Sequence, residues 1–402
     1  MRRMTAVPNA SVIDQIAVHF DADLIALRRD LHRWPELAGD ERRTASAVAE
    51  RLRAAGLSVS TGIGGHGVVA VLDGAGLGPT VAYRADMDAV AADELAGGEF
   101  ASQVPGAAHL CGHDLHTTIG VGIAETLSRL RHRFSGRVVF VFQPAEETLD
   151  GARAMIDAGL LNWAAPEEMY ALHCSPLPVG AFAVMPGAGQ PGLDVGHIDV
   201  SGPNAADTGA QLVASINDMS TVTEPQTPEE FAQLLNDLQA TDGPLARFVF
   251  TGALLTPADD GAVRVQFWLR TWPDDRYPAL REDVRRLAHS VGATRVEFPQ
   301  PPFPSMVCSP ELSRAAATHL RGVPGVSTVE VFHAPFPFNG EDFALFLRRV
   351  PGAMFFLGVA NPDAGVNGLP HAPGFAADER AIGLGVRAMT GLLLSRLHTL
   401  HR

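Results

Sequence analysis

The sequence predicts an α/β fold, an open mixed sheet with helices on both faces, interrupted by an inserted α+β domain. Short apolar runs alternate with longer segments of helical apolar spacing on both sides of the middle of the chain. That alternation weakens between residues 192 and 301, and 402 residues are many for one hydrophobic core. We therefore expect a discontinuous larger domain, residues 1–191 and 302–402, and an insert of residues 192–301.

The expected elements follow the apolar periodicity and the turn residues between them. In the larger domain the helices are 11–34, 41–55, 115–130, 151–160 (which Asp150 is placed to cap), 340–348 and 379–398. The strands are 67–73 and 79–85, joined by a turn at 74–78, and 136–142, 168–172 and 353–359. In the insert we expect strands at 197–201 and 263–270 and helices at 209–217, 228–238 and 278–290.

Composition excludes several classes of function. The formal net charge of −14 argues against binding to nucleic acids or anionic membranes. No lysine occurs, which excludes Schiff-base, pyridoxal-lysine and Walker-lysine chemistry. The three cysteines form no disulfide framework, and no apolar run is long enough to span a bilayer. We expect a cytoplasmic protein that acts on a small molecule.

One motif is misleading. Residues 187–192 match the letters of a dinucleotide-binding fingerprint, but Pro191 and a strand-like run follow where a helix is required. We interpret this segment as a linker turn.

Polar residues gather where the predicted strands end. Asp86 and Asp88 follow one strand, the pair Glu146 and Glu147 follows a second, and His173 follows a third. His371 lies in the loop beyond strand 353–359, and segment 109–116 places three histidines, a thiol and an acid just before a helix. Ligands of open α/β sheets bind at the carboxyl edge, so these segments are expected to meet there.

These residue types are those of a transition-metal site. Five candidate ligands exceed what one tetrahedral ion needs but suit two divalent ions, zinc, manganese, cobalt or nickel, that share a water. Glu146 is then the expected general base, with Asp88 the second candidate for that role. Asp88 and Asp114 are expected to orient histidines, and His109 and His116 either to support the ligands or to be structural. The five candidate ligands are Cys111, His113, Glu147, His173 and His371.

Each residue alone also has a purely structural interpretation. Glu146 and Glu147 could be acidic residues that precede a helix, and His173 could be an ordinary core histidine. His371 could be an ordinary loop residue, and Cys111 could fill a small apolar space. Their joint occurrence at strand ends favours the metal site.

Five phrases, 31–37, 84–89, 109–116, 143–147 and 340–343, resemble the aminoacylase, hippurate-hydrolase and indoleacetyl-amino-acid hydrolase branch of the dinuclear metallopeptidases. The resemblance implies the same five metal ligands and Glu146 as the general base. It also implies an inserted lid domain that closes over the substrate and commonly forms a homodimer.

The insert departs from the family pattern. The family's lid carries a Gly-Gly-His-Ala phrase, but residues 200–206 contain no histidine, and Asn204 is the remaining neutral donor. The lid asparagine before an Ile-Pro or Val-Pro step is also missing near residues 254–258. Arg270 matches a recurring lid arginine and is the candidate for binding a substrate carboxylate.

We therefore expect an amidohydrolase that cleaves the linear amide bond of a small N-acyl amino acid or dipeptide-like substrate. A first alternative is another hydrolysis on the same dinuclear site: deacetylation, carbamate cleavage or deamination. A second alternative is a non-catalytic metal-binding or regulatory relative. The presence of Glu146 beside a full ligand set favours an enzyme.

Overall fold

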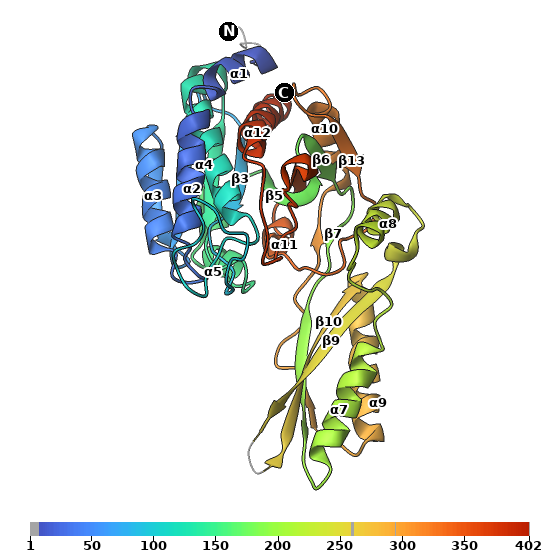
Figure 1. The fold of residues 1–402 in the computed structure, drawn as a ribbon. Coiled ribbons are helices and arrows are strands. Elements are labelled where there is room, and N and C mark those ends of the chain that lie inside the picture. The colour runs from blue at the N-terminus through green and yellow to red at the C-terminus, as the bar shows by residue number, and fades with distance from the viewer. Residues whose placement is uncertain (1–7, 259–260, 294, 402) are drawn as a thin grey trace. The chain divides into compact units, whose positions relative to one another are not determined.

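The computed structural model describes residues 8–258, 261–293 and 295–401. It divides into two compact units (Figure 1). The first comprises Met1–Pro186, Cys308–Val331 and Leu345–Arg402, and the second comprises Gly187–Val307 and Phe332–Ala344.

An eight-stranded mixed sheet forms the centre of the first unit, in the order β1-β2-β4-β3-β5-β14-β6-β13. The four central strands β4, β3, β5 and β14 run parallel to one another, whereas β2 pairs antiparallel with β1 and β4, and β6 pairs antiparallel with β14. The predicted open mixed sheet is confirmed. The strands are β1 (Ser58–Ile63), β2 (Gly67–Asp73), β3 (Thr80–Asp86), β4 (Arg137–Gln143), β5 (Glu168–Pro178), β6 (Ala181–Val184), β13 (Thr328–Val331) and β14 (Gly352–Ala360).

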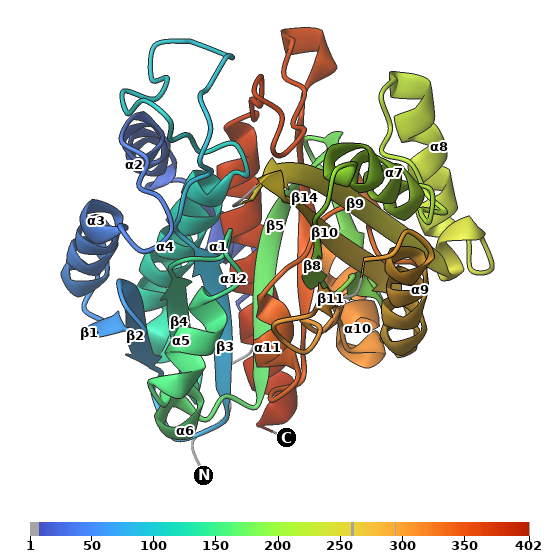
Figure 2. The ribbon, with the colours of Figure 1, turned by 90° about the horizontal axis from the view of Figure 1, so that it is seen from below.

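Helices cover both faces of this sheet (Figure 2). The two longest, α4 and α12, pack against each other and against the central strands. None of the helices in the described part of the chain has the length and apolar character needed to span a bilayer. The helices are α1 (Ala10–Ala17), α2 (Asp21–Arg33), α3 (Arg42–Ala54), α4 (His113–Leu130), α5 (Gly151–Asp157), α6 (Leu160–Ala164), α10 (Pro310–Leu320), α11 (Phe343–Leu347, at the boundary of the two units) and α12 (Arg380–Leu400).

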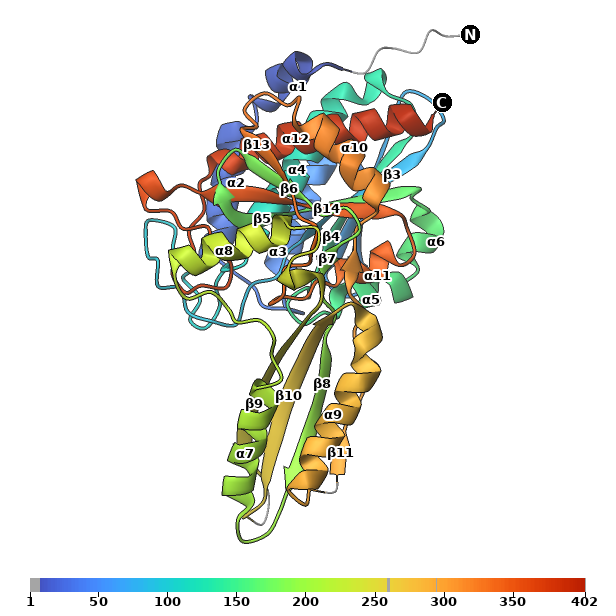
Figure 3. The same ribbon diagram turned by 90° about the vertical axis from the view of Figure 1, so that its right-hand side faces the viewer.

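The second unit is a four-stranded antiparallel sheet with α7 and α9 packed on one face (Figure 3). Alternate residues of its central strand, Val265, Phe267 and Leu269, share a core with both helices. Its elements are β7 (Gly189–Gln190), β8 (Asp194–Val200), α7 (Ala205–Asn217), α8 (Pro228–Gln239), β9 (Phe248–Pro257), β10 (Val263–Trp272), α9 (Tyr277–Ser290), β11 (Arg295–Glu297) and β12 (Met306–Val307).

Several local expectations differ from the structure. The expected helix 11–34 is broken by a turn at residues 18–20, and Arg387 of α12 binds Asp14 and Asp21 on the two sides of that break. Asp150 precedes α5, but its side chain makes no capping hydrogen bond, so the predicted cap was wrong. Strands β2 and β3 are not neighbours, because β4 lies between them.

Seven strands of the described residues were not expected from the sequence, and the reason is identifiable for two of them, β1 and β9. The edge strand β1 is largely exposed, so it lacks the apolar alternation of a buried strand. The other, β9, contains Gly252, which sequence patterns treat as a strand breaker. A Cβ at this position would lie 1.8 Å from the indole ring of Trp268, so the ring packs directly on the Gly252 backbone.

The second unit also includes residues 332–344, which the sequence placed in the larger domain. The backbone N–H of His333 donates to the carbonyl of Leu238 in α8 at 2.7 Å. Phe338 packs edge-to-face on Phe250 at 5.1 Å between ring centroids. These contacts join segments about a hundred residues apart, which no local pattern indicates.

A buried ion pair ties the start of β5 to α12. Arg396 donates to both carboxylate oxygens of Glu168 at 2.6 and 2.9 Å, and the Tyr170 hydroxyl donates to the same carboxylate at 2.6 Å. We expect Glu168→Gln to lower the free energy of unfolding by about 1–3 kcal/mol, because Arg396 and Tyr170 lose a charged acceptor. Urea denaturation measures this change.

The matched control is Asp73→Asn, which removes the same charge from an exposed pair with Arg137 on the same sheet. Solvent screens that pair, so little change is expected. Equal effects of the two substitutions would contradict the importance of the buried ion pair.

Candidate metal centre and active site

The carboxyl ends of β4, β3 and β5 meet at one edge of the sheet, because the three strands are parallel neighbours. Asp86 is the last residue of β3, and Asp88 follows in the next loop. Glu146 and Glu147 follow the end of β4. His173 was expected to follow a strand but lies within β5, which continues to Pro178. It lies at the same edge because the pairing of β5 with β3 ends at Ala171.

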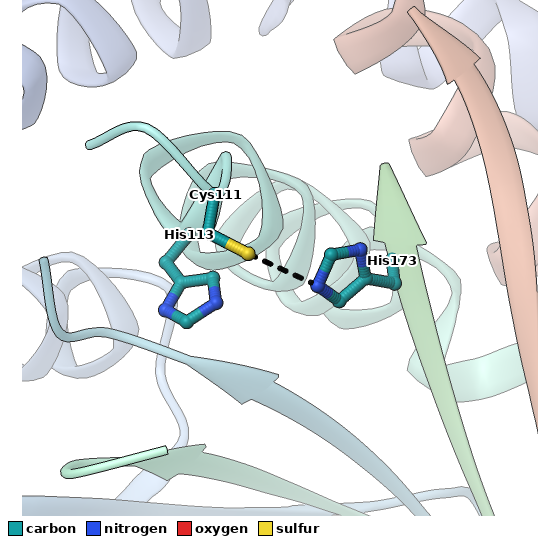
Figure 4. A group of neighbouring side chains, drawn as sticks. All are labelled: Cys111, His113 and His173. Atoms are coloured by element: carbon teal, nitrogen blue, oxygen red, sulfur yellow. Dashed lines mark hydrogen bonds between the residues drawn. The ribbon is translucent and has the colours of Figure 1, made fainter. Parts of the chain in front are cut away.

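The segment Cys111–His113 turns sharply into α4. Gly112 has φ +82°, and a Cβ there would lie 2.5 Å from the Cys174 sulfur, so no other residue fits. His113 is the first residue of α4. Figure 4 shows Cys111, His113 and His173 converging, with 3.4 Å between Cys111 Sγ and His173 Nε2.

Two buried carboxylates hold the loop that carries the glutamate pair. The Ala145 N–H donates to Glu41 Oε1 at 2.8 Å, and the Glu147 N–H donates to Asp88 Oδ2 at 2.9 Å. Glu146 thus lies between two amide groups that are fixed from outside the loop. Its Oε2 lies 3.9 Å from His113 Nε2, and Glu147 Oε1 lies 3.7 Å from the same nitrogen.

The loop after β14 brings in His371. Its backbone N–H donates to the carbonyl of Leu110 at 2.8 Å, and its Nε2 lies 3.6 Å from Glu147 Oε2. His371 has φ +62° and Ala145 has φ +52°. Such left-handed conformations cost on the order of 1–3 kcal/mol in residues other than glycine and tend to cluster at functional sites.

The five predicted ligands fall into two overlapping groups whose ligand atoms lie within 4.8 Å of one another. Cys111, His113 and His173 form one group, and Cys111, Glu147 and His371 form the other. His113 Nε2 and Glu147 Oε1 are buried and have no hydrogen-bond partner among the described residues. Buried polar atoms without a hydrogen-bond partner are expected where a cation binds. The imidazole, thiol and carboxylate groups present are suitable ligands for divalent metal ions.

The electrostatics of the site also favour a cation. Burial lowers the pKa of His113, but the charges of Asp86, Glu147 and Asp88 and a hydrogen bond to Asp88 outweigh it and raise that pKa to about 10. Burial and the neighbouring Glu147 raise the pKa of the Cys111 thiol. Burial holds the pKa of His173 well below its ordinary value, so this imidazole is neutral, as a metal ligand must be.

Comparison with known proteins identifies the family. The model of peptidase family M20/M25/M40 matches residues 82–400. The chain belongs to this family. A probable hydrolase of a Synechocystis species is 33% identical over 374 residues, 90% of this chain and 93% of its own. The N-acetylcysteine deacetylase of Bacillus subtilis is 30% identical over 95% of this chain and 98% of its own.

A solved structure agrees with this assignment. A dinuclear metal binding peptidase of the M20 family from Bacillus subtilis has a TM-score of 0.74 and 27% identity, covering 95% of this chain and 99% of its own. The family and fold class expected from the sequence are confirmed. This M20 protein is a hydrolase, so the alternative of a non-catalytic relative does not hold.

The residues predicted to orient histidines have different partners in this M20 protein. His113 Nδ1 donates to the backbone carbonyl of Asp88 at 2.9 Å, and the Asp88 side chain is fully buried. Asp114 instead binds His32 and Arg28, at 2.7 and 2.8 Å, and contacts none of the five predicted ligands through these bonds. The 31–37 phrase contains His32 but does not indicate this pairing, because His32 lies 82 positions from Asp114.

Two further residues at the site, Glu41 and Arg84, were not predicted. Both are fully buried, and Arg84 donates to Gln143 and pairs with Asp86. Burial would raise the pKa of Asp86, but the nearby His113 and Arg84 and the hydrogen bond from His116 hold it well below its ordinary value. The 84–89 phrase indicated that Asp86 lies at the end of a strand but did not indicate its role. Nothing in the sequence indicated a role for Glu41.

The predicted substrate residues of the insert lie in the second unit. Asn204 is exposed and precedes α7 without capping it through its side chain. Arg270 donates to the carbonyl of Gly192 at 3.4 Å, and Gly340 packs closely on its guanidinium group. Carboxylate binding by Arg270 and donation by Asn204 stay predictions, as does a homodimer through the insert.

Replacement of Cys111 tests the ligand set. We expect Cys111→Ala to lower the bound metal and to abolish turnover together, because the thiolate is a shared member of both ligand groups. Inductively coupled plasma mass spectrometry of the dialysed protein measures the metal. The control is Cys308→Ala, which removes a buried thiol next to Met354.

Full metal content and full rate in Cys111→Ala would show that the thiol is not a ligand. A matching loss in Cys308→Ala would show that the effect comes from general destabilisation.

Proposed function

We propose that this protein is an amidohydrolase that cleaves the amide bond of a small N-acyl amino acid or dipeptide-like substrate at two divalent metal ions. Cys111, His113, Glu147, His173 and His371 would hold the ions. The observation that carries the proposal is the position of Glu146. Its carboxylate lies against the ligand group, and the backbone on both sides of it is fixed by Glu41 and Asp88.

The chemistry that two such ions supply is polarisation of the scissile carbonyl and activation of a water molecule. The chain's own contribution is acid–base catalysis by Glu146. This carboxylate accepts a proton from the attacking water and then donates it to the leaving nitrogen. Because Ala145 and Glu147 are held through their N–H groups, the backbone that carries Glu146 is fixed on both sides.

Asp88 supports this division of roles. One of its carboxylate oxygens accepts from the Glu147 N–H, and its backbone carbonyl accepts from His113. It is therefore occupied in holding a ligand and the loop of Glu146 at the same time. We assign proton transfer to Glu146 and positioning to Asp88.

Deacetylation is a second candidate, since the acyl group that is removed can be acetyl. It is favoured by the 30% identity with the N-acetylcysteine deacetylase, which extends over almost the whole of both chains. Rates on matched N-acetyl, N-benzoyl and dipeptide substrates, measured with zinc, manganese, cobalt or nickel added to the apoprotein, distinguish the candidates. No amide hydrolysis on any substrate with any metal would contradict the proposal.

Glu146→Gln tests the general base. The substitution keeps the shape of the side chain and removes the proton acceptor, so we expect kcat to fall by about 10² or more while both metals stay bound. Stopped-flow or chromatographic assays measure the rate, and mass spectrometry measures the metal. Glu50→Gln, an equal charge change on the exposed side of α3, is the control.

If Glu146→Gln keeps most of its activity, another acid carries the proton. If it loses its metal, Glu146 is a ligand and not a base.

A further inference from the structure

We propose that His116 is a positioning residue that holds His173 in place for metal binding without binding metal itself. It would do so by supplying the hydrogen-bond acceptor that β5 lacks where its pairing with β3 stops. This inference rests on the proposed function, because it concerns the geometry of the ligand set. A chain of buried hydrogen bonds that links β3, α4 and β5 supports it.

The sheet register creates the need for an acceptor. Strands β3 and β5 pair from Val81 with Glu168 to Arg84 with Ala171, and the register ends there. β5 continues to Pro178 on the other side, paired with β14. Cys174 therefore lies beyond the end of the β3–β5 ladder, and its backbone N–H is still buried. An unpaired buried N–H costs about 1–3 kcal/mol.

His116 meets that need. The Cys174 N–H donates to His116 Nε2 at 2.8 Å. Because a backbone N–H can only donate, Nε2 must be the unprotonated nitrogen, and the proton of this neutral ring is on Nδ1. Nδ1 in turn donates to Asp86 Oδ1 at 2.6 Å. His116 thus bridges the last residue of β3 to β5, from a position on α4.

Arg84 completes this bridge. Asp86 pairs through its other carboxylate oxygen with Arg84, whose Nε donates to Gln143 on β4 at 2.9 Å. Arg84, Asp86 and His116 are each at most 1% exposed. The position of Cys174 is therefore set by side chains of β3 and α4 and indirectly by β4.

The neighbouring peptide carries the ligand. His173 Nδ1 donates to the carbonyl of Cys174 at 2.8 Å, so its proton is on Nδ1 and its Nε2 lone pair faces Cys111 Sγ at 3.4 Å. Cys174 is held at its N–H by His116 and at its carbonyl by His173. A shift of the Cys174 backbone consequently moves the His173 ring, and with it the distance between His173 Nε2 and the other ligand atoms.

The same bonds exclude His116 as a ligand. It lies near other metal-binding side chains, in groups with Asp86 and His113 and with His173 and Cys174. Both of its ring nitrogens are already engaged, one as donor and one as acceptor. Partners of this kind typically change metal affinity by 10–100-fold when they are removed.

Two substitutions separate the two bonds of His116. In His116→Asn the amide takes the place of Nδ1, so the bond to Asp86 can persist while the acceptor for Cys174 is lost. In His116→Gln the longer side chain places its amide oxygen near the position of Nε2, so the acceptor for Cys174 persists while the donor to Asp86 is lost. Both variants remove the imidazole ring, so both lose the packing contacts of that ring.

We expect His116→Asn to bind zinc and cobalt about 10–100-fold more weakly than the parent and His116→Gln to stay within about threefold of the parent. Chelator competition measures the affinities. The cobalt absorption bands, including those from the Cys111 thiolate, are expected to change in His116→Asn and to be retained in His116→Gln. His319→Gln, which alters a partly buried histidine bonded to Ala388, is the control and should leave both readouts unchanged.

A merely structural histidine would lower the thermal stability of both variants and leave their metal affinities alike. Equal affinities, whether both parental or both reduced, would overturn the positioning role, and an equal large reduction would point to direct ligation. Circular dichroism identifies a variant that does not fold. In that case the other variant and the hydrogen exchange of the metal-free proteins test the positioning role.

Hydrogen exchange of the metal-free proteins tests the bond itself. Mass spectrometry of peptides that cover residues 170–178 should show the Cys174 amide protected in the parent and in His116→Gln and exchanging faster in His116→Asn. Equal exchange in all three would overturn the inference. If the parent binds no cation and hydrolyses no amide, the proposed function fails, but this exchange result still decides whether His116 holds Cys174.

Discussion

Four carboxylates converge on one buried imidazole in this protein. Asp86, Asp88, Glu146 and Glu147 each have an oxygen within 3.4–3.9 Å of a ring nitrogen of His113. Like charges this close repel strongly in a buried environment unless positive charge is present. The Arg84 guanidinium group supplies some of it, and divalent cations bound by a neutral His113 would supply more. The surrounding architecture maintains this concentration of negative charge.

This arrangement requires strained backbone conformations and residues that hold them in place. Ala145 and His371 adopt left-handed conformations that only a well-determined surrounding can enforce. That surrounding includes Glu41 on the Ala145 amide and the Leu110 carbonyl on the His371 amide. The Cys174 peptide is held in a similar way, by His116 at one end and His173 at the other. Rigid placement of the ligands thus depends on hydrogen bonds to the backbone more than on contacts between the ligands.

The insert keeps its fold while its functional phrases have changed. Its core joins Ile198, Leu212, Phe267 and Val284 from the sheet and both helices, and this core needs only apolar alternation. Residues 200–206 span the end of β8, the following turn and the start of α7, and residues 254–258 span the end of β9 and the residue after it. Val200 and Ala205 belong to the core, whereas the other residues of these two segments lie outside it. Most positions at which the insert departs from the family pattern therefore do not affect its core.

The sequence by itself determined the fold class, the family and the residue types of the site. Runs of apolar residues specify β2, β3, β4 and α4 closely, because each element is buried along almost its whole length. The end of β4 and the loop after β14 direct Glu146 and His371 to one edge of the sheet. Only the tertiary structure decided which partners hold those residues. Glu41 reaches Ala145 across 104 positions, and Asp114 pairs with His32 across 82, so no local spacing could indicate either bond. The sequence leaves open whether His116 supports a ligand or is structural, because its task depends on where the β3–β5 ladder ends, and register is set by packing between strands distant in sequence.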